Sequence, residues 1–236
     1  MINEIKNIKF NRAVVPSDAV DMNMETINVA DAGESLVCAA VYVRFLRRDG
    51  SPSCQLIFAR TKVIHDHTIP HAEMVAAVLN ASTGFVVKSS LKERVKQSWY
   101  VTDSQVTLYL INSTTAALKT WPRNRVVEVN RLSDRKHWFH TKRGNMVADL
   151  GTCKGATVQQ VSPGSPWIEG LPWMRKDSSE FSLSTVEDIK LSASDKRDAN
   201  QEQVFPETEA HVCLSYVPKD VEARYAFSQY LVNPNK

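Results

Sequence analysis

Four carboxylates occupy positions where the sequence predicts strand ends or the first turns of helices. They come from separate segments and are Asp31, Glu73, Asp103 and Asp149. A single acidic residue at such a position is most often a cap or a surface charge, so no member identifies a site alone. As a set, they offer the oxygen ligands that hard divalent cations prefer. Gathered without a metal, two unit charges 4 Å apart would repel each other by about 4 kcal/mol at an effective dielectric of 20.

Three predicted strands begin the segments that must position these carboxylates. Residues 26–30 form a short strand next to Asp31, and residues 36–46 are nearly all apolar, which predicts a strand covered on both faces. Asp49-Gly50 is a strong hairpin signal, and residues 55–61 form the third strand. The pattern therefore predicts an antiparallel meander.

The next segments place two more carboxylates. Thr68 and Pro70 are typical of a helix start, so Glu73 falls in the opening turns of the helix that follows. A fourth strand is expected over residues 98–102, with Asp103 at its carboxyl end, directly before a helix over 105–111. Open α/β sheets place ligand-binding groups at such strand ends.

The last elements of this region are a helix over residues 122–132, a fifth short strand over 137–140 and a helical start over 146–150 that carries Asp149. In the first of these helices, Val126 and Val129 should face inward and the arginines outward. The order of elements predicts an α/β fold with a five-stranded mixed sheet, three strands antiparallel and two parallel, flanked by helices.

Composition divides the chain into four parts. We expect an N-terminal connecting segment (1–25), the α/β domain (26–160), a Trp/Pro-rich extension (161–175), and an acidic linker with a partial C-terminal segment (176–236). The last part has eleven acidic and seven basic residues. Residues 176–209 have few apolar residues, which is typical of a linker, whereas 212–217 and 221–232 could form a strand and a helix.

Basic residues are dense between Lys119 and Arg143, with eight Lys or Arg against two acids. Such a stretch favours a polyanionic partner, although any solvated helix face can carry arginines. The candidate nucleic-acid contacts are Lys119, Arg123, Arg125, Arg131, Lys142 and Arg143. Phosphate contacts would give affinity that does not depend on sequence.

Several protein classes fit poorly. The first eleven residues lack the apolar stretch of a secretory signal, and no run approaches the roughly 20 apolar residues of a membrane span. The four cysteines have no zinc-like spacing and fit a reducing compartment. His65, His67 and His71 also fit no zinc pattern. We therefore expect a soluble protein that is not secreted and has no membrane partner.

Four segments resemble, in order, successive blocks of the ribonuclease H region in BEL/Pao-type retrotransposon polyproteins: VADAGESLVCAAVYVRF, ARTKVIHDHTIPHAEMVAAVLN, WYVTDSQVTLYLI and WFHTKRGNMVADLGTCKG. NRVVEVNRL and GSPWIEGLPWM extend the match, and YAFSQYLVNPNK resembles the stretch leading towards the integrase. The resemblance implies a ribonuclease-H-like fold in which Asp31, Glu73, Asp103 and Asp149 bind two Mg²⁺ ions, or Mn²⁺, and hydrolyse the RNA strand of an RNA/DNA hybrid during reverse transcription. His140 matches a histidine that assists the metal site, although a strand-end histidine with a backbone partner is an equal alternative.

The same resemblance implies reverse-transcriptase and integrase domains of one polyprotein as partners, in a cytoplasmic virus-like particle. The chain departs from the family pattern at Ala32, at Met146-Val147 and at Cys153-Lys154. None of these departures removes a metal ligand. The alternative function is a catalytically degenerate module of the same fold that binds nucleic acid or connects polyprotein domains.

Overall fold

A five-stranded mixed sheet forms the centre of the protein. The computed structural model describes residues 15, 18–20, 24–65 and 68–203. The strands are β1 (Met24–Ala32), β2 (Leu36–Leu46), β3 (Pro52–Val63), β4 (Val95–Thr102) and β5 (Trp138–His140). Their spatial order is β3-β2-β1-β4-β5. Strands β1 to β3 pair antiparallel, whereas β4 pairs parallel with β1 and with β5, which confirms the predicted sheet.

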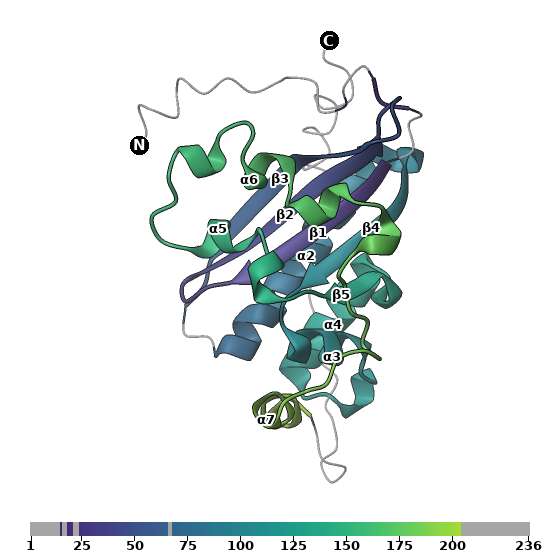
Figure 1. Cartoon of the computed structure of the whole chain (residues 1–236). Helices are drawn as coiled ribbons and strands as arrows, with labels where there is room; N and C mark the ends of the chain where they lie inside the picture. Colours follow the sequence, from purple (N-terminus) through teal and green to yellow (C-terminus); the bar gives the residue numbers. More distant parts are fainter. Residues whose placement is uncertain (1–14, 16–17, 21–23, 66–67, 204–236) are drawn as a thin grey trace.

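The helices cover both faces of this sheet. They are α2 (Ile69–Leu91), α3 (Gln105–Asn112), α4 (Thr120–Leu132), α5 (Asp149–Thr152), α6 (Pro166–Glu169) and α7 (Ala193–Gln201). In Figure 1, α2 lies behind the sheet, and α5 and α6 lie in front of it. Single 3-10 turns occur at Lys92–Arg94, Thr115–Ala117, Arg135–His137, Arg143–Asn145, Gln159–Val161, Pro172–Arg175 and Ser178–Glu180.

Helix α2 packs closely on β1 and β4 because it has a glycine at the crossing point. A Cβ atom added to Gly84 would lie 2.6 Å from Asn28 Oδ1 and 2.7 Å from Tyr100 Cε1. The stretch Ile69–Arg94 is long and apolar enough to cross a membrane by length and composition only, but 61% of its most apolar window is buried in the protein. Because α2 packs against β1 and β2, it has the properties of a core helix.

The opposite face of the sheet is covered by the chain between β5 and α7. Met146, Trp173 and Met174 are buried there against side chains of β1 and β2. This second cover explains why β2 is buried on both faces, as its apolar sequence predicts. The buried guanidinium of Arg44, on β2, pairs with Glu25 and donates a hydrogen bond to the carbonyl of Lys176.

The acidic segment corrects one expectation. Residues 176–203 are not the structureless linker that their composition suggested. Helix α7 begins with a capping box between Ser192 and Asp195, and its Ala199 is buried in the cluster formed by α2, α3 and α4. A few well-placed apolar residues suffice here because this helical layer leaves an apolar surface for them. The four-part division of the chain stays a prediction, and residues 204–236, with the expected strand and helix at 212–217 and 221–232, lie outside the described residues.

The remaining expectations differ from the structure mainly in their boundaries. Strand β3 is longer at both ends than the expected 55–61 because its pairing with β2 runs from Leu36↔Val63 to Leu46↔Pro52. Helix α5 begins at Asp149 rather than at residue 146, because a 3-10 turn at Arg143–Asn145 precedes it.

Candidate metal centre

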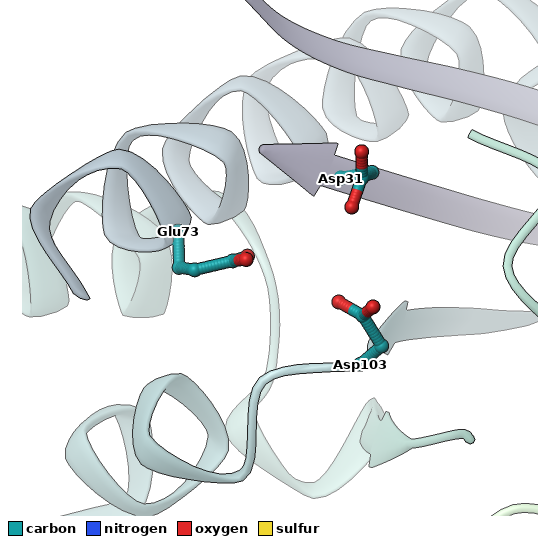
Figure 2. A group of neighbouring side chains, drawn as sticks. All are labelled: Asp31, Glu73 and Asp103. Carbon is teal, nitrogen blue, oxygen red and sulfur yellow. The ribbon is translucent and has the colours of Figure 1, made fainter. Parts of the chain in front are cut away.

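Two neighbouring parallel strands bring the carboxylates of Asp31 and Asp103 together. Asp31 lies near the end of β1, and Asp103 directly follows β4, which pairs parallel with β1. Parallel strands end at the same edge of a sheet, so these side chains meet there. Glu73 comes from the opening turns of α2, which packs on β1. Figure 2 shows the three side chains directed towards one common space.

The three carboxylates are close enough to share a cation. One oxygen from each of Asp31, Glu73 and Asp103 lies within 4.8 Å of the other two. Within the part of the chain that the structure describes, Glu73 Oε2 and Asp103 Oδ1 are buried and have no hydrogen-bond partner. Buried oxygens without donors are costly unless a cation or a proton neutralises them. The donor set therefore fits a divalent metal that prefers oxygen ligands.

Asp149 approaches the same site from the opposite face of the sheet, on α5. It is not among the three residues whose oxygens meet within 4.8 Å, but it interacts electrostatically with Asp31 and Asp103. Like Glu73 and Asp103, it has a buried oxygen, Oδ1, without a partner among the described residues. The structure thus places three predicted ligands together and the fourth beside them.

A glycine lets α5 come this close. A Cβ atom added to Gly151 would lie 2.8 Å from Cys38 Cβ and would overlap Cys38 Sγ. The same helix carries Thr152, whose hydroxyl donates a hydrogen bond to Asp31 Oδ2. We did not predict Thr152 from the sequence. Its spacing of three residues from Asp149, which is one helical turn, is the signal that could have indicated it.

The carboxylates raise one another's pKa values. Burial, and then the neighbouring Asp103 and Asp31, raise the pKa of Glu73 to about 8. Burial and Asp31 raise the pKa of Asp103 to about 6. Burial, Asp31 and Asp103 raise the pKa of Asp149 to about 6. Without a cation, the cluster therefore holds protons at pH values where exposed carboxylates have lost them.

Two positively ionisable side chains border the carboxylates. Arg143 lines the same cavity and lowers the pKa values of Glu73, Asp103 and Asp149. His140 Nε2 lies 3.2 Å from the carbonyl oxygen of Asp103, and burial lowers the pKa of His140. His140 thus faces the site and also has the backbone partner that the alternative interpretation expected.

The cavity around the centre has a volume of about 590 Å³. It opens between the end of β1, the first turns of α2 and α3, and α7. Its lining includes the three clustered carboxylates, His140 and Arg143, and two residues of α7 that we did not predict, Asp195 and Asp198. These two are distant in the sequence from every recognisable motif, so only the fold identifies them.

The basic residues of the Lys119–Arg143 stretch do not form one surface. The guanidinium of Arg123 donates hydrogen bonds to the carbonyls of Thr115 and Leu118 and so supports the fold. Arg125 lies over the Trp121 ring and 3.7 Å from Glu128. Lys119 and Lys142 are exposed and precede α4 and the turn at Arg143–Asn145.

Arg131 lies in a separate groove, at the end of α2 that is distant from Glu73. The groove has a volume of about 950 Å³ and contains four more basic side chains: Lys88, Lys92, Arg135 and His137. Asp134 is the acidic residue in its lining. Lys88 and Lys92 belong to α2 and its end, outside the basic stretch, so the sequence pattern alone did not indicate them.

The histidines near Glu73 show no zinc-like arrangement among the described residues. His71 Nε2 lies 3.0 Å from Glu202 Oε1, and its ring stacks on Trp121 with centroids 4.1 Å apart. His65 is exposed, and His67 lies outside the described residues.

Comparison with known families supports the resemblance seen in the sequence. Residues 1–104 match the family model described as the Pao retrotransposon-like RNaseH-like domain. The matched range includes Asp31, Glu73 and Asp103, whereas His140 and Asp149 lie beyond it. A search of curated proteins gave no match.

Three solved structures show distant similarity. An N-terminal RNase H domain from Mycobacterium tuberculosis, fused to maltose binding protein, is 11% identical, with a TM-score of 0.35 over 52% of this chain and 86% of that one. RNase H1 from Halobacterium salinarum is 16% identical, with a TM-score of 0.32 over 51% and 86%. A foamy viral protease-reverse transcriptase in complex with an RNA/DNA hybrid is 10% identical, with a TM-score of 0.30 over 58% of this chain and 20% of that one.

Proposed function

We propose that this protein is a retroelement ribonuclease H, because residues 1–104 match the family model described as the Pao retrotransposon-like RNaseH-like domain. It hydrolyses the RNA strand of an RNA/DNA hybrid during reverse transcription. The observation that carries the proposal is the convergence of Asp31, Glu73 and Asp103 oxygens within 4.8 Å of one another, with the ends of two parallel strands and one helix as supports. This geometry favours the enzyme over a degenerate module, because a module that only binds nucleic acid gains nothing from clustered buried carboxylates.

The proposed cofactors are two Mg²⁺ ions, with Mn²⁺ as a substitute. Asp31, Glu73 and Asp103 would hold one of them, and Asp149, whose Oδ1 lacks a partner among the described residues, would complete the second position with Asp31. Bound there, such cations supply an activated water and stabilise the departing 3′ oxygen.

The chain's own side chains supply orientation and charge. Thr152 holds one oxygen of Asp31 by a hydrogen bond and so keeps that carboxylate turned towards the centre. Arg143 brings a positive charge to the cavity, where it can attract the phosphate to be cleaved. His140, whose Nε2 atom contacts the backbone carbonyl of Asp103, is proposed to assist the metal site.

Phosphates further along the hybrid would contact other basic groups. The groove around Arg131 combines residues of α2, α4 and the turn before β5, and such contacts release counterions without reading sequence. Recognition of the hybrid itself would depend on its minor groove and its 2′-hydroxyls. We propose that this step occurs beside reverse-transcriptase and integrase domains of one polyprotein, in a cytoplasmic virus-like particle.

A cleavage assay on an end-labelled RNA/DNA hybrid tests the proposal. With Mg²⁺ or Mn²⁺, the unmutated protein should cut the RNA strand internally and leave 5′-phosphate and 3′-hydroxyl ends. Asp103→Asn should reduce the rate at least about 100-fold, since even the partners of metal ligands contribute 10- to 100-fold, and should retain hybrid binding.

The matched control is Asp49→Asn, which makes the same chemical change in the exposed turn between β2 and β3. It should cleave like the unmutated protein. A folded, hybrid-binding protein that shows no metal-dependent cleavage would overturn the enzyme proposal in favour of the binding module.

A further inference from the structure

The C-terminal part of the described chain crosses the edge of the candidate metal centre. We call residues 184–203 the C-terminal strap. At its start, Ser184 and His140 exchange backbone hydrogen bonds of 2.8 and 2.9 Å. At its end, the Lys119 N–H donates to the carbonyl of Glu202 over 2.9 Å, and Gln203 forms a β-bridge with Leu118. The strap is therefore joined to the domain on both sides of α7.

Apolar packing and a contact between two polar side chains also fix the strap. Ala199 is only 2% exposed and belongs to the cluster formed by α2, α3 and α4. Val186, Ile189 and Leu191 pack against the same cluster, and α7 lies next to α3 at the bottom of Figure 1. Glu202 Oε1 lies 3.0 Å from Nε2 of His71, which is two residues before Glu73. These contacts hold α7 at a defined place relative to the carboxylates.

That place brings two further negative charges to the cavity of the centre. Asp195 and Asp198 line the same cavity as Asp31, Glu73 and Asp103. They lie three residues apart and therefore on one side of α7. Asp195 also has a structural role, because its carboxylate accepts hydrogen bonds from Ser192 in the capping box. Helix capping does not explain Asp198, which lies past the first turn.

Negative charges at this position oppose the approach of a nucleic acid. A duplex carries one phosphate charge per about 1.7 Å of its axis, and repulsion between charges extends over a Debye length of about 10 Å at 0.1 M salt. Any backbone that reaches the clustered carboxylates must enter the cavity that α7 borders. Arg143 brings a guanidinium to that cavity's lining, and each carboxylate of α7 opposes the attraction of this group for phosphate.

We propose that Asp195 and Asp198 weaken the entry of nucleic acid into the centre by repelling its phosphates. This inference rests on the proposed function, because it assumes that the cavity admits a phosphate backbone. Nucleic acid therefore occupies the centre only where other basic groups of the protein attract it strongly enough to offset the repulsion by the strap.

Hybrid binding on an Asp103→Asn background tests the inference, since we expect this variant to bind the hybrid without cleaving it. The acidic residues are changed as Asp198→Asn alone, which leaves the capping box intact, and as Asp195→Asn with Asp198→Asn. At about 50 mM salt, the double variant should bind about three- to tenfold more tightly, and the gain should fall below about twofold at 0.5 M salt, where the Debye length is about 4 Å. Asp198→Asn should give part of the gain.

The matched control is Glu180→Gln with Glu187→Gln, which removes two exposed charges from the same region of the chain but not from the cavity lining. It should change the affinity by less than about twofold. Equal affinities of the double variant and this control, or weaker binding by the double variant, would overturn the inference. The affinities are measured without cleavage. If the unmutated protein does not cleave the hybrid, this result counts against the proposed function, and the affinities of the double variant and the control can still be compared.

Discussion

In the carboxylates and in the basic residues of this protein, separation along the chain and distance in the folded structure are related in opposite ways. Asp31, Glu73 and Asp103 are 30 or more residues apart in the chain, yet their oxygens meet within 4.8 Å. The basic residues between Lys119 and Arg143 are close in the chain, yet they separate into a fold-supporting arginine, a cavity arginine and a distant groove.

The difference follows from where each set lies on its elements. Parallel strands that are neighbours must end at one edge of the sheet, so residues at strand ends converge whatever their separation in sequence. Consecutive side chains on α4 point in different directions around the helix axis, and only residues three or four apart share a face. One helix therefore distributes its charges around its axis. Local charge density is accordingly a weaker predictor of a site than the position of a residue at a strand end.

The largest expected effect is the stabilisation of the folded protein by a divalent metal, and this effect should depend on pH. The folded pKa values of Glu73, Asp103 and Asp149 lie above the ordinary values. Between about pH 4 and pH 8, the metal-free folded state therefore binds more protons than the unfolded state, so the free energy of unfolding should fall as pH rises through this range. A divalent cation at a hundred times its Kd at pH 8 should raise Tm at that pH by about 5 to 10 °C. The same cation concentration should raise Tm by less at pH 5.5, where protons compete for the carboxylates.

Thermal melts with and without Mg²⁺ at the two pH values measure this effect. Glu73→Gln should raise the metal-free Tm at pH 8, since it removes the carboxylate with the highest pKa of the three, and should reduce the gain from Mg²⁺. Glu93→Gln, in the exposed turn after α2, serves as the control. A Tm that does not respond to Mg²⁺ at either pH would show that the carboxylates do not form a metal centre.

Gly151→Ala should test whether the close approach of α5 positions the fourth carboxylate. The added Cβ atom collides with Cys38, so we expect a loss of about 1 to 3 kcal/mol in unfolding free energy and slower cleavage through displacement of Asp149 and Thr152. Gly144→Ala adds the same atom where nothing lies within 4 Å and should change both by much less. Chemical denaturation and the hybrid assay give the two readouts, and equal behaviour of the two variants would contradict this role of Gly151.

The basic residues should differ among themselves, and here the effects are smallest. Arg131→Gln should weaken hybrid binding about two- to fourfold at low salt and reduce the slope of log affinity against log salt by about one, without changing Tm. Arg123→Gln should instead lower stability by about 1 to 2 kcal/mol, because its guanidinium donates hydrogen bonds to three backbone carbonyls. Binding titrations and melts of both variants separate the roles, and a loss of binding without destabilisation in Arg123→Gln would reverse this assignment.

The elements that hold the centre could be predicted from sequence because their signals are local. The apolar run of β2, the hairpin at Asp49-Gly50 and the cap and proline at the start of α2 each depend on neighbouring residues. They were sufficient to predict five strands and the placement of Asp31, Glu73 and Asp103. The acidic segment gave the wrong expectation because composition averages over residues, whereas the packing of Ala199 depends on one side chain at one place.

The sequence by itself determined the order and type of the central elements, and with them the edge at which Asp31 and Asp103 meet, since hydrophobic periodicity and turn chemistry are written in adjacent residues. Only the tertiary structure decided what else reaches that edge. Thr152 binds Asp31 because Gly151 permits α5 to approach, and Asp195 and Asp198 border the cavity because Ala199 is buried among three helices. Contacts of this kind depend on the shapes of surfaces built from distant segments, which no local pattern encodes.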